Sequence, residues 1–167
     1  MLKKIVLFAF LCFPLGMIAQ DVKIAHVNSM EIFNVMPETA AAETELANLN
    51  QSLHVELQNM EEEYNKKYTE FMQQSDSLAQ SIRIRRMQEV EDLKNRIETF
   101  YQQAQQDVAK KRNDLNAPIV QRIQSAIQAV GNEQGYTYMM EMGAFLYASP
   151  TKSIDATQQV KDKLGLK

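Results

Sequence analysis

The sequence predicts a mostly helical α+β protein in which a long antiparallel coiled-coil hairpin projects from a small antiparallel β body. Three observations predict this fold. Residues 38–134 contain a single glycine and a single proline, Pro118, apolar side chains recur there every seven positions, and strand-like runs occur only near the two ends of the chain. A seven-residue apolar repeat keeps one seam of a helix against a partner helix along a left-handed supercoil.

The first 19 residues are predicted to be a secretory signal peptide that is cleaved after Ala19. Two lysines precede an apolar run, residues 5–18, that is broken by Pro14. A membrane anchor would need about 20 apolar residues without such a break. A lipoprotein signal would need a cysteine at the end of the run, whereas Cys12 lies in its middle. The exported chain would therefore be residues 20–167.

Loss of this leader would change the composition in two ways that matter for function. Cys12 is the only cysteine, so the exported chain would have neither disulfides nor a thiolate metal site. Two lysines would also leave, which takes the formal net charge from −3 to −5. An acidic chain argues against nucleic acid as a partner, because proteins that bind nucleic acid are usually basic.

The exported chain is expected to begin with a strand and a short helix. Residues 23–28 (Lys-Ile-Ala-His-Val-Asn) alternate in the way a strand does. Asn28 followed by Glu31 resembles a capping box, which predicts a short helix over residues 29–36. Pro37 should end that helix and open the next one, since proline is tolerated in a first helical turn.

The two arms of the hairpin are predicted from their apolar repeats. The segment between them, residues 73–77, is polar and poor in helix propensity, so the chain should reverse there. The outgoing repeat is Leu57, Tyr64, Phe71 and Leu78 beside Leu46, Leu53 and Met60, and the returning repeat is Met87, Tyr101, Val108 and Leu115 beside Val90, Ile97 and Ala104.

After Pro118 the apolar face of the returning helix widens, as expected where a helix packs on a sheet. Gly135 is placed to end that helix. Residues 136–142 and 144–148 are apolar runs separated by Gly143, which predicts a β-hairpin that completes an antiparallel sheet. Asp155, with Gln158 three residues later, should begin a last helix.

These elements divide the exported chain into a body, residues 20–37 and 118–167, and an arm, residues 38–117. We expect apolar residues of the body to pack strands against the broad helix face and against other subunits. These body residues are Ile24, Val27, Ile119, Ile123, Ile127, Tyr138, Met140, Phe145 and Tyr147.

The motifs at the two ends resemble those of the Skp/OmpH family of periplasmic chaperones. They are K-I-A-H-V-N at 23–28 and, over residues 118–164 and the alanine before them, A-P-I-V-Q-R-I-Q-S-A-I, G-Y-T-Y-M-M-E, F-L-Y-A-S-P and D-A-T. The hairpin matches that family only in its coiled-coil character. The family often has D-I-T where this chain has Asp155-Ala156-Thr157. Familiar members are also strongly basic, whereas this chain is acidic.

The resemblance implies a homotrimer with a central barrel-like β body and three helical arms. It also implies an ATP-independent holdase, without a cofactor, that encloses unfolded outer-membrane proteins and prevents their aggregation. Apolar side chains near or off the arm seam are then candidates for client binding. They are Tyr64, Tyr68, Phe71, Met72 and Phe100, of which Tyr68, Met72 and Phe100 are predicted off the seam. The alternative is that they only complete the seam.

Arg83, Arg85 and Arg86 form a basic cluster near the predicted tip. They are candidates for acidic client segments or for lipopolysaccharide or a membrane surface, with a solvated tip as the alternative. No catalytic or metal site is predicted. Glycine-rich phosphate loops and hydrolase motifs are absent from the sequence, and His26 and His54 lie far apart without cysteines. A periplasmic coiled-coil spacer or adaptor for a folded partner remains the alternative function.

Overall fold

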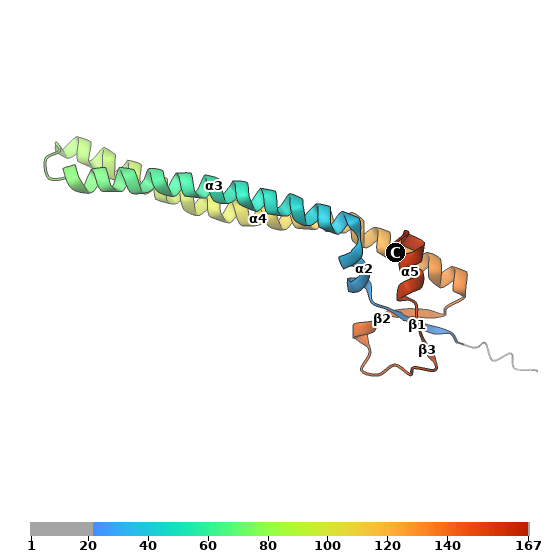
Figure 1. The fold of residues 1–167 in the computed structure, drawn as a ribbon. Helices are drawn as coiled ribbons and strands as arrows, with labels where there is room; N and C mark the ends of the chain where they lie inside the picture. Colours follow the sequence, from blue (N-terminus) through green and yellow to red (C-terminus); the bar gives the residue numbers. More distant parts are fainter. Residues whose placement is uncertain (1–21, 167) are drawn as a thin grey trace, which may run out of the picture.

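A computed structural model describes residues 22–166 of the chain. The predicted leader and its cleavage after Ala19 lie outside these residues. The described chain forms a long rod of two helices joined to a small body of one sheet and three helical segments (Figure 1). No helix within this part of the chain combines the length and the apolar character that a membrane span requires.

The first elements follow the capping signals of the sequence. Strand β1 (Ile24–Val27) leads into helix α2 (Ser29–Val35). The Asn28 side chain accepts a hydrogen bond from the backbone N–H of Glu31 at 3.0 Å, as a helix N-cap does. Helix α3 (Pro37–Gln74) then begins at the proline, so the predicted start of the arm is confirmed.

The arm is an antiparallel pair of long helices, α3 and α4 (Gln80–Gln134). They lie side by side in Figure 1 and are joined at the far end by residues 75–79. At a rise of about 1.5 Å per residue, α3 is about 57 Å long. Helix α4 continues through Pro118 into the body and ends at Gly135, whose φ of 66° is the left-handed conformation typical of a glycine after a helix.

The sheet differs from the predicted one. Strand β2 (Tyr138–Glu141) and strand β3 (Ser153–Asp155) flank β1 in the order β2-β1-β3, and both pair with it in parallel. The prediction of an antiparallel sheet was therefore wrong. Gly143 does not turn a hairpin, because Met142–Ala144 forms a 3-10 turn (η1) and residues 145–152 form a loop. Each strand returns to the same end of the sheet through a longer connection, which is the condition for parallel pairing.

The core of the body lies between one face of the sheet and the helices. Ala25 and Val27, which alternate with Ile24 and His26 along β1, are buried against α2, α4 and the last helix, α5 (Thr157–Leu164). The buried cluster comprises Val27, Ile32, Met36, Ala42, Ile119, Ile123, Ala126, Val130 and Val160. The broad apolar face after Pro118 is thus the main wall of this core.

Of the two residues expected to begin helix α5, Asp155 and Gln158, only Asp155 bonds to the start of the helix. The Asp155 carboxylate accepts a hydrogen bond from the backbone N–H of Thr157 at 2.9 Å. The Gln158 side chain does not complete a capping box, because its amide donates to Asp162 at 2.8 Å. The Thr157 hydroxyl accepts from the backbone N–H of Asn28 at 3.0 Å, which links the start of α5 to the end of β1.

Candidate functional site

The seam between α3 and α4 is thin, and this limits how much apolar surface the arm hides. On the outgoing helix every residue of the apolar repeat from Leu46 to Phe71 is half-buried, and within the arm only Thr39 and Ala42 at its root and Leu93 are buried. A two-helix rod has no third layer to cover the outer sides of its seam. Large apolar side chains therefore remain partly open to solvent along its length.

Near the middle of the returning helix, the residues that face the other helix differ from those predicted. Phe100 is half-buried, whereas Tyr101 and Met87, predicted on the seam, are 54% and 53% exposed. The buried and half-buried residues here are Leu93, Ile97, Phe100, Ala104, Val108, Lys111 and Leu115. Between Phe100 and Val108 this series takes two successive steps of four, which is a stutter in a heptad repeat. The stutter moves the seam by one residue, so the prediction that Phe100 lies off the seam was wrong.

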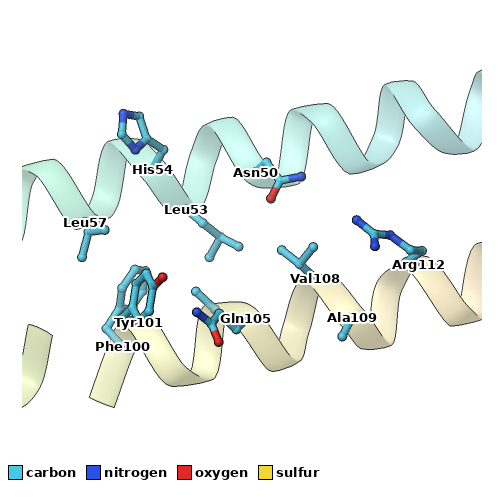
Figure 2. A pocket seen from close by; sticks show the side chains of 11 residues that line it. Asn50, Leu53, His54, Leu57, Phe100, Tyr101, Gln105, Val108, Ala109 and Arg112 are labelled. Atoms are coloured by element: carbon cyan, nitrogen blue, oxygen red, sulfur yellow. The ribbon is translucent and has the colours of Figure 1, made fainter. Parts of the chain in front are cut away.

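A groove of about 330 Å³ opens in the arm at this stutter (Figure 2). Figure 2 shows Leu53 and Leu57 pointing from α3 toward α4, with Phe100 and Tyr101 at one end and Arg112 at the other. The groove exists because two of the α4 residues that line it are alanines, Ala104 and Ala109, which do not fill the space between the helices. Its lining is mostly apolar, and it could receive a single apolar side chain.

A second, wider groove lies on the arm beside the first. Its volume is about 810 Å³, and it is lined by Met60 and Phe100 together with polar residues such as Asp92 and Arg96. Phe100 lines both grooves. The stutter therefore gives the middle of the arm an aromatic side chain that is reachable from two sides.

Other candidate side chains lie nearer the tip. Tyr68 and Met72 are exposed, while Tyr64 and Phe71 are half-buried in the seam. Tyr64 and Tyr68 stack with their ring centroids 5.9 Å apart, so the exposed Tyr68 ring lies against a residue of the seam. Ile82, Ile84 and Met87 add exposed apolar side chains at the start of α4, and sequence reasoning did not single out the two isoleucines. The sequence feature that could have identified Ile82 and Ile84 is their position just after the predicted chain reversal.

The basic cluster at the tip is partly neutralised. Arg85 and Arg86 both approach Glu89, with nitrogen–oxygen distances of 3.6 and 3.5 Å. Within the described chain Arg83 makes no ion pair. The three arginines thus lie together at the tip, but only Arg83 carries its charge without a carboxylate partner.

The outer face of the sheet carries several residues that were predicted to pack inward. Tyr138 and Met140 are exposed, and so is Tyr147 in the following loop. They do not pack on the Ile119–Ile127 face within the chain, because the parallel register places Tyr138 and Met140 beside Ile24 and His26, which face away from the helices. Half-buried Met139 packs against the core instead.

The two histidines lie at separate places. His26 lies on the outer sheet face, where its Nδ1 is 2.8 Å from the Ser153 hydroxyl and its ring meets Phe145 edge-on. His54 lies on the arm and points away from α4 (Figure 2). Within residues 22–166 no group of three or more histidine, cysteine, aspartate or glutamate side chains is arranged to hold a metal ion.

The Asp155 carboxylate lies beside His26 at the start of α5. Its hydrogen bond with the Thr157 side chain is the largest cause that lowers the pKa of Asp155 below its ordinary value. The backbone N–H of Thr157 and the charges of His26 and Lys161 act in the same direction, against a raising effect of partial burial. These interactions favour the ionised carboxylate just before α5.

Comparison with known proteins decides the family. The model of a family described as outer membrane protein (OmpH-like) matches residues 23–164, which is most of the chain. The chain belongs to the OmpH-like family. The match extends through the body and the whole arm, so it covers both parts of the fold described above.

Relatives within this family are similar along nearly their whole length. Chaperone protein Skp of Yersinia enterocolitica is 30% identical over 85% of this chain and 88% of its own. Chaperone protein Skp of Photorhabdus luminescens is 31% identical over 90% of this chain and 92% of its own. Chaperone protein Skp of Escherichia coli K12 is 30% identical over 96% of this chain and 100% of its own. The OmpH-like protein of Caulobacter crescentus CB15 has the same fold, with a TM-score of 0.72 over 84% of this chain and 82% of its own at 17% identity.

Proposed function

We propose that this chain is an ATP-independent holdase of the periplasm that encloses unfolded outer-membrane proteins between helical arms and prevents their aggregation. Its membership of the OmpH-like family, and the name chaperone carried by relatives at 30–31% identity, confirm the expectation of a chaperone. The client class, the enclosing assembly and the export of residues 20–167 are the further content of the proposal.

The observation that carries the proposal is the row of apolar side chains left open along the arm. Tyr68, Met72, Ile84, Met87 and Tyr101 are all exposed, and they occur at several levels of the rod. Tyrosine and methionine give apolar contact without requiring one partner shape, since methionine is flexible and tyrosine has a polar tip. Many weak, interchangeable contacts suit a client that has no fixed structure.

We propose the body, residues 20–37 and 118–167, as the part that assembles three chains, with residues 38–117 as the arm. Strands β2 and β3 are both edges of the three-stranded sheet, so each presents unpaired backbone groups. The outer sheet face adds exposed Tyr138 and Met140. Pairing of edges between copies would close the sheet and cover that face, which supports a barrel-like centre.

We also propose the arm tip as a contact for lipopolysaccharide or an anionic membrane surface. Arg83 lies between Ile82 and Ile84, both exposed, so the tip combines a free cation with apolar side chains. This combination favours surfaces that are both anionic and apolar. Replacing Arg83 with alanine should weaken binding to lipopolysaccharide vesicles at low salt, and an unchanged affinity would exclude the contact.

The experiment that tests the main proposal is dilution of a urea-unfolded outer-membrane barrel into buffer with and without the exported chain. Light scattering should fall as the chain is added, and native mass spectrometry should show three chains alone and three with one client. Several unrelated barrels should be held. If none is held and a folded partner binds the arm instead, the chain is a spacer or adaptor.

A further inference from the structure

The loop between β2 and β3 carries the least protected apolar side chains of the described chain. Leu146 is fully exposed and Tyr147 is 77% exposed, and Met142 just before them is exposed as well. Three apolar side chains within six residues of one loop are unusual for a surface that contacts only water. They indicate a surface that is covered in the working protein.

A groove of matching character lies between two helices of the body. It has a volume of about 480 Å³ and runs between α2 and α4. Its apolar lining comes from Met30 and Phe33 on α2 and from Val120, Ile123 and Ile127 on α4, with polar residues Asn116, Gln124 and Glu141 beside them. Met30 and Val120 are exposed, so the groove is open to a side chain from outside.

The loop is held away from the groove of its own chain. Phe145, immediately before Leu146, meets the His26 ring with a centroid distance of 6.4 Å, on the sheet face that points away from the helices. The groove is lined by helices that cover the other face. The chain leaves the groove rim at Glu141, but Phe145 lies on the outer sheet face and Leu146 is fully exposed, so Leu146 does not occupy the groove of its own chain.

The charges of the two surfaces are also complementary. Lys152, at the end of the loop, is exposed and makes no ion pair among the described residues. Glu141 lines the groove, and its only partner there is the backbone N–H of Ser29, at 3.2 Å from one carboxylate oxygen. The loop thus combines apolar side chains with the cation of Lys152, and the groove combines an apolar lining with the carboxylate of Glu141 at its rim.

We infer that Leu146 and Tyr147 of one chain dock in the α2–α4 groove of a second copy of this chain. This contact rests on the assembly proposed above and specifies how neighbouring copies meet. It joins two different surfaces, so it is heterologous, and repeated contacts of this kind close into a ring when the rotation allows. Three chains would each provide one loop and one groove.

Cysteine cross-linking of the exported chain, which has no cysteine of its own, tests the geometry. The double variant Leu146→Cys/Val120→Cys should form covalent dimers and trimers on mild oxidation, because each chain would be linked to two neighbours. Either single variant can link only two chains. The pair Leu146→Cys/Ile84→Cys is the matched control, since Ile84 is equally open but lies on the arm. A double variant that stops at dimers overturns the contact.

A charge substitution tests its energetic weight. Leu146→Lys should raise the concentration at which the assembly dissociates by about tenfold or more, since burying a leucine side chain is a substantial part of such a contact. Adding Val120→Glu should restore much of the loss, and Ile84→Lys should have no effect. If wild-type chains are monomeric in native mass spectrometry, the proposed assembly fails together with this contact. If wild type is oligomeric and Leu146→Lys leaves it unchanged, only this contact fails.

Discussion

Two neighbouring aromatic residues in the arm should separate stability from client binding. Phe100 is half-buried in the seam, whereas Tyr101 is 54% exposed beside the same groove. Replacing a fully buried phenylalanine with alanine costs about 3–5 kcal/mol, so the half-buried Phe100 should lose about 2 kcal/mol of unfolding free energy. Tyr101→Ala should change the unfolding free energy by less than about 1 kcal/mol, as exposed positions usually do.

Urea unfolding followed by circular dichroism at a fixed chain concentration measures the first effect. With a denaturant slope of about 2 kcal/mol per molar, Phe100→Ala should lower the midpoint by about 1 M. The second effect is measured by the amount of chain needed to suppress aggregation of an unfolded barrel, which Tyr101→Ala should raise. Tyr101→Phe is the control, because it keeps the ring and should keep the activity.

The reasoning fails if the two alanine variants have equal midpoints, since the seam would then not pass through Phe100. It also fails for client binding if Tyr101→Ala holds clients as well as wild type does.

Three further predictions concern the carboxylate of Asp155, two glycines and salt. Because the pKa of Asp155 is lowered in the folded state, its stabilising effect is present above about pH 4 and is lost as pH falls through the folded pKa. Asp155→Asn should therefore destabilise at pH 7 and match wild type at very low pH in thermal unfolding, and a constant difference would contradict this. Gly135→Ala should lower the unfolding free energy by about 1 kcal/mol, since the φ of Gly135 is 66°. Gly131→Ala should raise it by about 1 kcal/mol, because Gly131 lies inside α4 and faces open space. If both substitutions changed the unfolding free energy in the same direction, the backbone argument would be refuted. Raising salt from about 0.05 to 0.5 M should leave suppression of client aggregation intact, and a steep loss would show electrostatic capture.

The helices were predictable because their signals are local. The side chain of Asn28 caps α2, Pro37 opens α3 and Gly135 ends α4 in the left-handed conformation, each through contacts within a few residues. Such signals are present in the sequence itself, since the cap and its partner are neighbours in the chain. The same holds for the polar segment that became the turn at residues 75–79.

The sheet was not predictable in the same way, because strand direction depends on contacts between distant segments. Residues 136–142 and 144–148 read as a hairpin around Gly143, but β1 pairs with β2 and with residues 153–155 across most of the chain. The strand Ser153–Asp155 has only three residues and no alternation to reveal it. The register of β2 on β1, which pairs Tyr138 with Ile24 and Met140 with His26, places both side chains on the outer face rather than the expected inner one.

The seam of the arm shows an intermediate case. A strict heptad places Tyr101 inside, and over most of the arm that repeat was sufficient. Two successive four-residue steps, from Phe100 to Ala104 and on to Val108, exchange the two aromatics. Sequence alone gives Phe100 and Tyr101 similar weight, and only the packing of the two helices decides that Phe100 is half-buried and Tyr101 is exposed.

The acidic charge of the chain bears directly on how it would hold a client. The chain has a formal net charge of −3, which removal of the predicted leader would take to −5, so it has no general attraction for acidic segments, and at the tip Arg85 and Arg86 already share Glu89. What the arm offers instead is apolar surface that the thin seam cannot cover, including the groove at the stutter. Apolar contact is not screened by salt, whereas attraction between exposed charges is. Capture by this chain should therefore rest on burial of client side chains against the arm, and the exposed tyrosines and methionines are the residues on which it depends.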